Sequence, residues 1–193
     1  MLRIVAGRHR GRRLAAPEGL TTRPTAERVR QALFDMLWHA PWSPLAAGRA
    51  AVEDSRVLDA FAGTGALGLE ALSRGAAQAS FIEPDRAALA ALRRNIETLG
   101  EAGRSRVIAG DATRPPPAST PCSLILLDPP YGKELVPRAL AALGAAGWIA
   151  PGALVAAEVA KADALDVPGF ETLAERAHGA ARLVFLRAVS PPA

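Results

Sequence analysis

From Arg56 onwards the chain alternates between short apolar runs and longer segments with helical spacing. Runs of four or five mostly apolar residues, bounded by turn formers or charges, are typical of strands buried inside a parallel sheet. We expect such strands at residues 57–61, 79–82, 106–109, 123–127 and 153–157. We expect helices between them, at about 63–73, 84–99 and 134–146. Alternating strands and helices predict a doubly wound α/β sheet.

The two ends of the chain depart from this alternation. Near the N-terminus, Gly7 and Gly11 enclose a run of basic residues, which indicates a hairpin or loop that displays its charges. A helix is expected from Thr25 to about His39, because apolar residues recur there with a helical period. The last residues predict two strands, around 171–173 and 182–186, with a turn at His178-Gly179. These strands would form an antiparallel pair at one edge of the sheet.

The length of 193 residues fits one α/β domain with an extension. We expect a basic N-terminal extension over residues 1–40, a linker over 41–55 and the main domain over 56–190. Residues 139–157 carry no charge, but they contain three glycines and a proline. That stretch therefore predicts a helix end, a turn and a buried strand in preference to a membrane span.

Positive charge is concentrated at the N-terminus. Residues 1–30 hold eight arginines against two glutamates, whereas the remainder holds 15 basic and 17 acidic residues. The chain has 21 arginines and two lysines, so coding bias can explain the preference for arginine, but it does not explain the clustering. A basic arm on a nearly neutral domain favours a polyanionic partner. The candidate nucleic-acid contacts are Arg8, Arg10, Arg12, Arg13, Arg23, Arg28 and Arg30.

The sequence shows no pattern of metal ligands or disulfides. Cys122 is the only cysteine, which excludes a disulfide within the chain and fits a reducing cytoplasm. The three histidines are far apart and lack metal-ligand spacing, so no metal is expected.

The strongest chemical signal is Asp128-Pro129-Pro130-Tyr131, which directly follows the apolar run 123–127. Open α/β sheets bind ligands at the carboxyl ends of their strands. Two consecutive prolines stiffen this loop and remove its backbone donors. A carboxylate, a rigid carbonyl and an aromatic ring are thereby presented together. This set is suited to a planar molecule with an exocyclic amine. Asp128 and the Pro129 carbonyl would accept hydrogen bonds from the amine, while the Tyr131 ring stacks on the plane of the molecule.

A second signal is the loop with Gly63, Gly65 and Gly68, which follows the first strand. Glycines there allow a sharp turn and close approach to a nucleotide, and Glu83, 20 residues after Gly63, can bind ribose hydroxyls. The same pattern serves dinucleotide oxidoreductases, but Asp59 before the loop would repel a pyrophosphate and attract a cation. With Glu83, Asp111 and Asp128, which also stand at predicted strand ends, we expect it to form an acidic crevice. The crevice favours S-adenosylmethionine, which combines adenosine with positive charge.

These motifs resemble those of class I methyltransferases that modify exocyclic amines, and in particular the bacterial 16S ribosomal RNA guanine-N2 methyltransferase (RsmD-like) family. The resemblance covers nearly the whole chain. The motifs that carry it are Arg3-Ile4-Val5-Ala6-Gly7, Arg10-Gly11-Arg12, Thr22-Arg23-Pro24-Thr25, Arg28–Phe34, Asp59–Gly65, Glu83, Gly110-Asp111-Ala112 and Asp128–Tyr131.

The resemblance implies a Rossmann-like fold, a seven-stranded, mostly parallel sheet in the order 3-2-1-4-5-7-6. It also implies a cytoplasmic monomer that transfers methyl from S-adenosylmethionine, leaving S-adenosylhomocysteine, to a guanine N2 of 16S rRNA in the small ribosomal subunit or its precursor. The implied cofactor-binding residues are Asp59, Phe61, Gly63, Thr64, Gly65, Glu83, Asp111 and Ala112. The implied catalytic residues are Asp128, Pro129, Pro130 and Tyr131.

Two alternatives stay open on the residues. The same chemistry could act on another amine, such as adenine N6, cytosine N4 or a glutamine amide. The chain could instead be a basic RNA-binding module with a degenerate cofactor site, although its intact motifs argue against this. Guanine is favoured because it offers two adjacent donors, N1–H and N2–H, to the acceptor-only carboxylate of Asp128.

Overall fold

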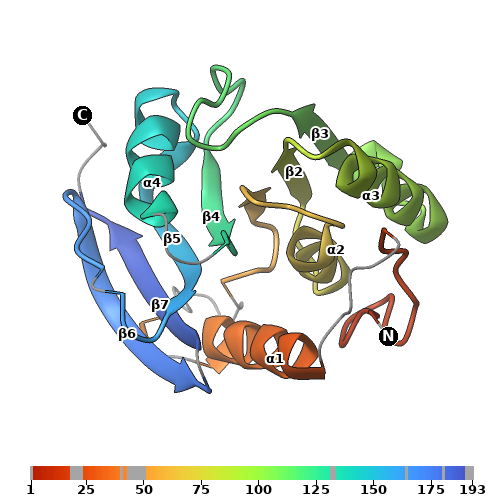
Figure 1. Ribbon diagram of the computed structural model, residues 1–193, viewed down its shortest axis with the longest axis horizontal. Helices are drawn as coiled ribbons and strands as arrows, with labels where there is room; N and C mark the ends of the chain where they lie inside the picture. The colour runs from red at the N-terminus through yellow and green to blue at the C-terminus, as the bar shows by residue number, and fades with distance from the viewer. Residues whose placement is uncertain are drawn as a thin grey trace.

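Seven strands form one sheet in the order β3-β2-β1-β4-β5-β7-β6 in the computed structural model (Figure 1). The structure describes residues 2–17, 24–39, 41–42, 51–130, 134–163, 165–179 and 181–189. The strands are β1 Arg56–Asp59, β2 Gln78–Glu83, β3 Ser105–Ala109, β4 Cys122–Leu127, β5 Ile149–Ala160, β6 Phe170–His178 and β7 Ala181–Ala188. The helices are α1 Pro24–His39, α2 Ala66–Ser73, α3 Arg86–Leu99 and α4 Leu135–Ala145, with a short 3-10 turn at Ala102–Arg104.

The pairing confirms the predicted sheet. The first five strands are parallel to one another, whereas β7 runs antiparallel to both β5 and β6. The strand order reverses between β1 and β4, because the chain leaves β1 towards β2 and returns to β4 on the other side. Such a reversal opens a crevice at the carboxyl ends of the strands, where α/β sheets bind their ligands.

Each face of the sheet has its own apolar core. Side chains alternate between the faces, so Val57 packs into one cluster and Leu58 into the other. The Val57 side is covered by α1, α2 and α3, and the Leu58 side by α4 (Figure 1). Because β4 is covered on both faces, its residues 124–127 form a continuous hydrophobic run.

Local chemistry explains where two helices begin and end. The Asp85 carboxylate accepts a hydrogen bond from Ala88 N at 2.8 Å, so α3 begins after Asp85 and two residues later than predicted. Gly100 caps this helix with φ of 70°, so the helix ends at Leu99, where the sequence predicted its end. Helix α2 begins at Ala66 instead of Gly63, because Gly63 and Gly65 have φ of 53° and 83°, in the left-handed region.

Residues 2–14 form the expected hairpin-like loop, with a single antiparallel bridge between Arg3 and Arg13. Ile4 N donates to Arg12 O at 2.9 Å and Gly11 N donates to Ile4 O at 2.9 Å. The loop lies against α2: a Cβ at Gly7 would come within 1.9 Å of Ser73 O. Only glycine therefore allows this contact.

One buried carboxylate, that of Glu70, holds this loop against α2. Glu70 on α2 has no exposed surface, and its oxygens accept Val5 N at 2.7 Å and Ala6 N at 2.9 Å. Arg74 Nε donates to the same carboxylate at 2.8 Å, and Arg30 Nε lies 3.6 Å from it. Arg30 is only 5% exposed. This corrects the expectation that Arg30 contacts nucleic acid, because its partners are in the protein interior.

The described ends of the predicted linker are also packed. The Trp42 ring lies 5.2 Å from that of Phe185, and Val52 is fully buried. Ile4, Leu14 and the apolar face of α1 belong to the same core cluster as the strands. The N-terminal extension thus shares its core with the sheet. Within the described ranges, no helix combines the length and apolar character needed to cross a membrane.

We expect Glu70→Ala to lower the free energy of unfolding by about 3–5 kcal/mol, because it leaves two buried guanidinium groups without a carboxylate. Urea denaturation followed by circular dichroism measures the change. Glu175→Ala is the matched control, since Glu175 pairs with Arg182 at the surface and such pairs contribute about 1 kcal/mol or less. Similar losses in the two variants would contradict the anchoring role of Glu70.

Candidate functional site

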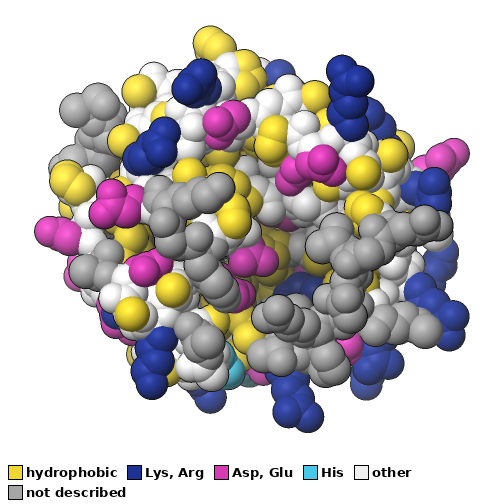
Figure 2. Space-filling model, in the orientation of Figure 1, with side chains coloured by type: hydrophobic (Ala, Val, Ile, Leu, Met, Phe, Trp, Pro, Cys, Tyr) yellow, Lys and Arg dark blue, Asp and Glu magenta, His cyan; other side chains and the backbone are white. Residues whose placement is uncertain are grey.

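A cavity of about 320 Å³ lies at the carboxyl ends of β1, β4 and β5. Its walls come from the glycine loop, from α1 and from the N-terminal segment through Leu2 and Ala16. Acidic side chains lie around a hollow at the centre of the face in Figure 2. The cavity therefore lies where the topology predicts a ligand, and the N-terminal extension forms part of it.

In the glycine loop, Gly65 and Gly68 pack closely against the protein, whereas the space around Gly63 is open. A Cβ at Gly65 would lie 2.3 Å from Leu92 Cδ1, and one at Gly68 would lie 2.3 Å from Phe81 Cε1. A Cβ at Gly63 would meet nothing within 4 Å, so its φ of 53° is what favours glycine there. Gly63, Thr64 and Phe61 line the cavity, and a ligand can reach the backbone at these positions.

Asp59 is a buried acid with one unsatisfied oxygen. It is 1% exposed; Oδ2 accepts Gly68 N at 2.8 Å, while Oδ1 has no hydrogen-bond partner. Burial raises the pKa of Asp59 to about 7, and the charge of Glu83 adds to this effect. An unpaired carboxylate oxygen in such a place favours a cationic or hydrogen-bond-donating ligand.

Asp128 lines the same cavity from the end of β4. Asp128 is exposed, and the cavity lies on its open side. Burial raises the pKa of Asp128 to about 7, with further contributions from the charges of Glu158 and Asp59. Pro129 is buried and Pro130 is exposed. Tyr131, the predicted stacking residue, lies outside the described residues.

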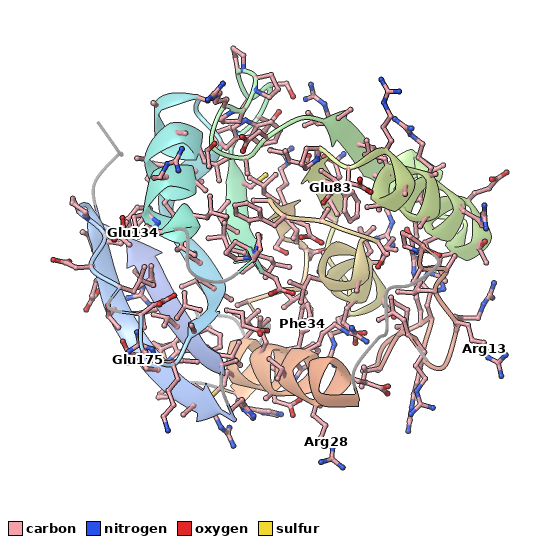
Figure 3. The ribbon with its side chains drawn as sticks, viewed as in Figure 1. Arg13, Arg28, Phe34, Glu83, Glu134 and Glu175 are labelled. Atoms are coloured by element: carbon pink, nitrogen blue, oxygen red, sulfur yellow. The ribbon has the colours of Figure 1, made fainter. Side chains whose placement is uncertain are left out.

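The remaining predicted cofactor residues, Glu83, Asp111 and Ala112, do not line the cavity. Glu83 ends β2, where Oε2 accepts Gly63 N at 2.8 Å and Oε1 accepts Asp85 N at 2.8 Å (Figure 3). Asp111 follows β3 and is exposed, and Ala112 is buried. Hydrogen bonds from Thr113 lower the pKa of Asp111. The predicted acids thus form two groups: Asp59 and Asp128 in the cavity, and Glu83 and Asp111 towards the β3 edge.

Two charged residues that the sequence did not single out for this site also line the cavity: Glu158 on β5 and Arg30 on α1. Glu158 follows the apolar run 153–157 as Asp128 follows 123–127, and that position was an available signal. No sequence signal marked Arg30 as a lining residue, because its burial depends on Glu70 and on the Arg3 carbonyl. Arg30 Nη2 donates a hydrogen bond to that carbonyl at 2.6 Å.

The other candidate arginines stay at the surface where the structure describes them. Arg10, Arg12, Arg13 and Arg28 are exposed, and Arg13 and Arg28 point away from the protein (Figure 3). Basic side chains gather along the edge formed by the N-terminal loop and α1 (Figure 2). Arg8 is half-exposed but pairs with the buried Glu101, which His9 also contacts at 2.6 Å. Arg23 lies outside the described residues.

The sheet order, the glycine loop after β1 and the acidic crevice define the class I methyltransferase fold. The chain belongs to the family described as "Conserved hypothetical protein 95", whose model matches residues 2–187.

Curated relatives and a solved structure agree with this assignment. The chain is 41% identical over 158 residues to Ribosomal RNA small subunit methyltransferase D of Escherichia coli K12, covering 81% of this chain and 74% of the relative. It is 33% identical over 176 residues to the protein of the same name from Haemophilus influenzae, covering 89% and 86%. The structure of "Putative methyltransferase yhhF" from Escherichia coli superposes with a TM-score of 0.79 at 36% identity, over 97% of both chains.

Proposed function

We propose that this protein transfers a methyl group from S-adenosylmethionine to the N2 amine of a guanine in small-subunit ribosomal RNA. The observation that carries the proposal is that Asp128, at the head of Asp-Pro-Pro-Tyr, lines the same cavity as the glycine loop and Asp59. A carboxylate suited to an exocyclic amine therefore faces the place suited to a cationic nucleotide cofactor. The names of the relatives support ribosomal RNA as the substrate.

The residues present fit the cofactor. The cavity volume of about 320 Å³ is at the lower end of the usual range for ligand sites, roughly 300–1,000 Å³. Asp59, Asp128 and Glu158 would face the sulfonium and the ammonium group, and Arg30 would face the carboxylate. Glu83 would accept the ribose hydroxyls, since each carboxylate oxygen can accept more than one hydrogen bond. Bound, S-adenosylmethionine supplies an electrophilic methyl group.

The protein's part in the reaction is to prepare the amine. The guanine N2 lone pair is delocalised into the ring, which makes the amine a poor nucleophile. Asp128 and the Pro129 carbonyl would accept hydrogen bonds from its two N–H groups and hold the nitrogen nearer a tetrahedral shape. Tyr131 would stack on the base. The raised pKa of Asp128 also lets this carboxylate take the proton that the methylated amine must release. Orientation of this kind contributes roughly 7–11 kcal/mol to lowering a barrier.

The basic edge would hold the RNA. Arg10, Arg12, Arg13 and Arg28 lie on the N-terminal loop and on α1, the elements that also wall the cavity. Phosphate contacts there position the RNA without reading its sequence. The target base must then leave its stack to reach Asp128, which costs a few kcal/mol.

We expect the purified protein to place label from S-adenosylmethionine in N2-methylguanosine of small-subunit RNA or particles, read after nuclease digestion and chromatography. Label in N6-methyladenosine would overturn the choice of base while the fold assignment stands. If cofactor binds but no RNA or particle accepts label, a non-catalytic binding module becomes the better description.

We expect Asp128→Asn to bind cofactor as the wild type does and to lose activity by about 10²-fold or more, the scale seen when one transition-state hydrogen bond is removed. The wild-type rate should rise with pH up to about 7 and then level off, because Asp128 accepts both a hydrogen bond and a proton only when ionised. Initial rates across pH, with calorimetry of cofactor binding, measure both effects. A pH-independent rate together with near-normal activity of the variant would exclude this role.

We expect Arg10→Gln and Arg13→Gln each to weaken RNA binding and to reduce the slope of log affinity against log salt by about one unit. Filter binding or fluorescence anisotropy across a salt series gives the slope. Arg176→Gln is the matched control, because Arg176 is exposed on β6, on the other side of the molecule from the N-terminal loop (Figure 1). Equal slopes for wild type and all three variants would mean that the arm is ordinary surface.

A further inference from the structure

A second cavity, of about 620 Å³, lies next to the first. Its walls come from Pro129 and Pro130, from the start of α4, and from the end of β5 with the segment that follows it. Glu158 lines both cavities, whereas Asp128 lines only the first. The Asp128–Pro129 corner therefore separates the two spaces, and Glu158 stands where they meet.

The two carboxylates at this junction are close enough to interact. The charge of Glu158 contributes to the raised pKa of Asp128, together with burial and Asp59. Carboxylates are acceptor-only when ionised, so a pair of them facing one space favours a ligand edge rich in N–H donors. The proposed reaction places the target amine at this corner.

We propose that the second cavity receives the extruded guanine and that Glu158 selects it by accepting a hydrogen bond from its N1–H group. The inference rests on the proposed function and adds to it the residue that reads the base. Asp128 and the Pro129 carbonyl then need to engage only the amine. A carboxylate has about four acceptor sites, so Glu158 can bind this edge alongside its contacts within the protein.

The rest of the lining suits a neutral base more than a phosphate. Leu135, Val136, Val159 and Leu165 provide apolar surface for a flat ring. The charged lining residues are mostly acidic: Glu134, Glu158, Asp163 and Asp166 against Arg138. Glu134 lies beside the start of α4 (Figure 3). Like charge would keep the backbone phosphates out, while the arginines of the N-terminal loop and α1 hold them elsewhere.

The choice between guanine and adenine follows from their edges. Adenine presents a lone pair at N1, beside its amine, where guanine presents N1–H. A carboxylate at Glu158 would meet repulsion from that lone pair. Sites built to bind a donor reject analogues that lack it far more strongly than apolar pockets reject a missing methylene, because a buried polar group is left unpaired.

The test uses 2-aminopurine, which keeps the 2-amine but has an acceptor in place of N1–H. Small-subunit RNA is prepared by ligation with guanine or 2-aminopurine at the nucleotide that the wild type methylates. We expect kcat/KM of the wild type to favour guanine by about 10²-fold or more. In Glu158→Gln the ratio should fall at least about 10-fold, because the side-chain amide can donate a hydrogen bond to the N1 lone pair of 2-aminopurine.

Two further variants separate base reading from other roles. Glu158→Asp keeps a carboxylate and should retain the preference for guanine. Asp166→Asn removes a charge from the same cavity, away from the junction, and should leave the ratio unchanged. If Glu158→Gln is inactive on both RNAs, the same ratio is taken from equilibrium affinities in the presence of S-adenosylhomocysteine.

An unchanged ratio in Glu158→Gln, with both rates or affinities reduced alike, would overturn the inference and assign Glu158 a structural role. In that case wild-type methylation of guanine would still support the proposed function. Absence of guanine methylation by the wild type would overturn both.

Discussion

The buried carboxylate of Glu70 is the interaction on which the site depends. It joins α2, which begins at the glycine loop, to Val5 and Ala6 of the N-terminal segment and to Arg30 of α1. These same segments wall the first cavity. A buried charge of this kind is tolerable only when several donors surround it, so the arm, α1 and α2 must be placed together. The same buried carboxylate therefore holds in place the candidate RNA-binding edge and the candidate cofactor site.

Desolvation is the second constraint on the site. Parallel strands end at one edge of the sheet, and this chain places an acid after three of the central ones, at Asp59, Asp128 and Glu158. Burial raises the pKa of Asp59 and of Asp128 to about 7, and repulsion adds to the shift, from Glu83 at Asp59 and from Glu158 and Asp59 at Asp128. A cationic cofactor in one cavity and a donor-rich base in the other would each relieve that repulsion. The ionised carboxylates are unfavourable in the empty site, and either ligand would stabilise them.

Most of the architecture was predictable, because it arises from local pattern. Residues 124–127 are apolar throughout, because β4 is covered on both faces, and such a run is recognisable from the sequence. Gly63 and Gly65 mark a turn that needs positive φ, and Gly100 ends α3 for the same reason. Motif order and spacing were sufficient to indicate the family that the comparison confirmed. Helix starts shifted by two or three residues where a cap, Asp85, or a left-handed glycine intervened.

Only the tertiary structure decided which distant residues meet. Arg30 reads as one more cation of a basic arm, but Glu70, 40 positions away, draws it into the interior and into the wall of the cavity. Glu158 reads as the polar end of a strand until the adjacency of β4 and β5 places it opposite Asp128, between two cavities. Periodicity reports how a residue relates to its own helix or strand. Burial, pairing and shifted acidity depend on which other elements pack against it, and that information appears only when the chain is folded.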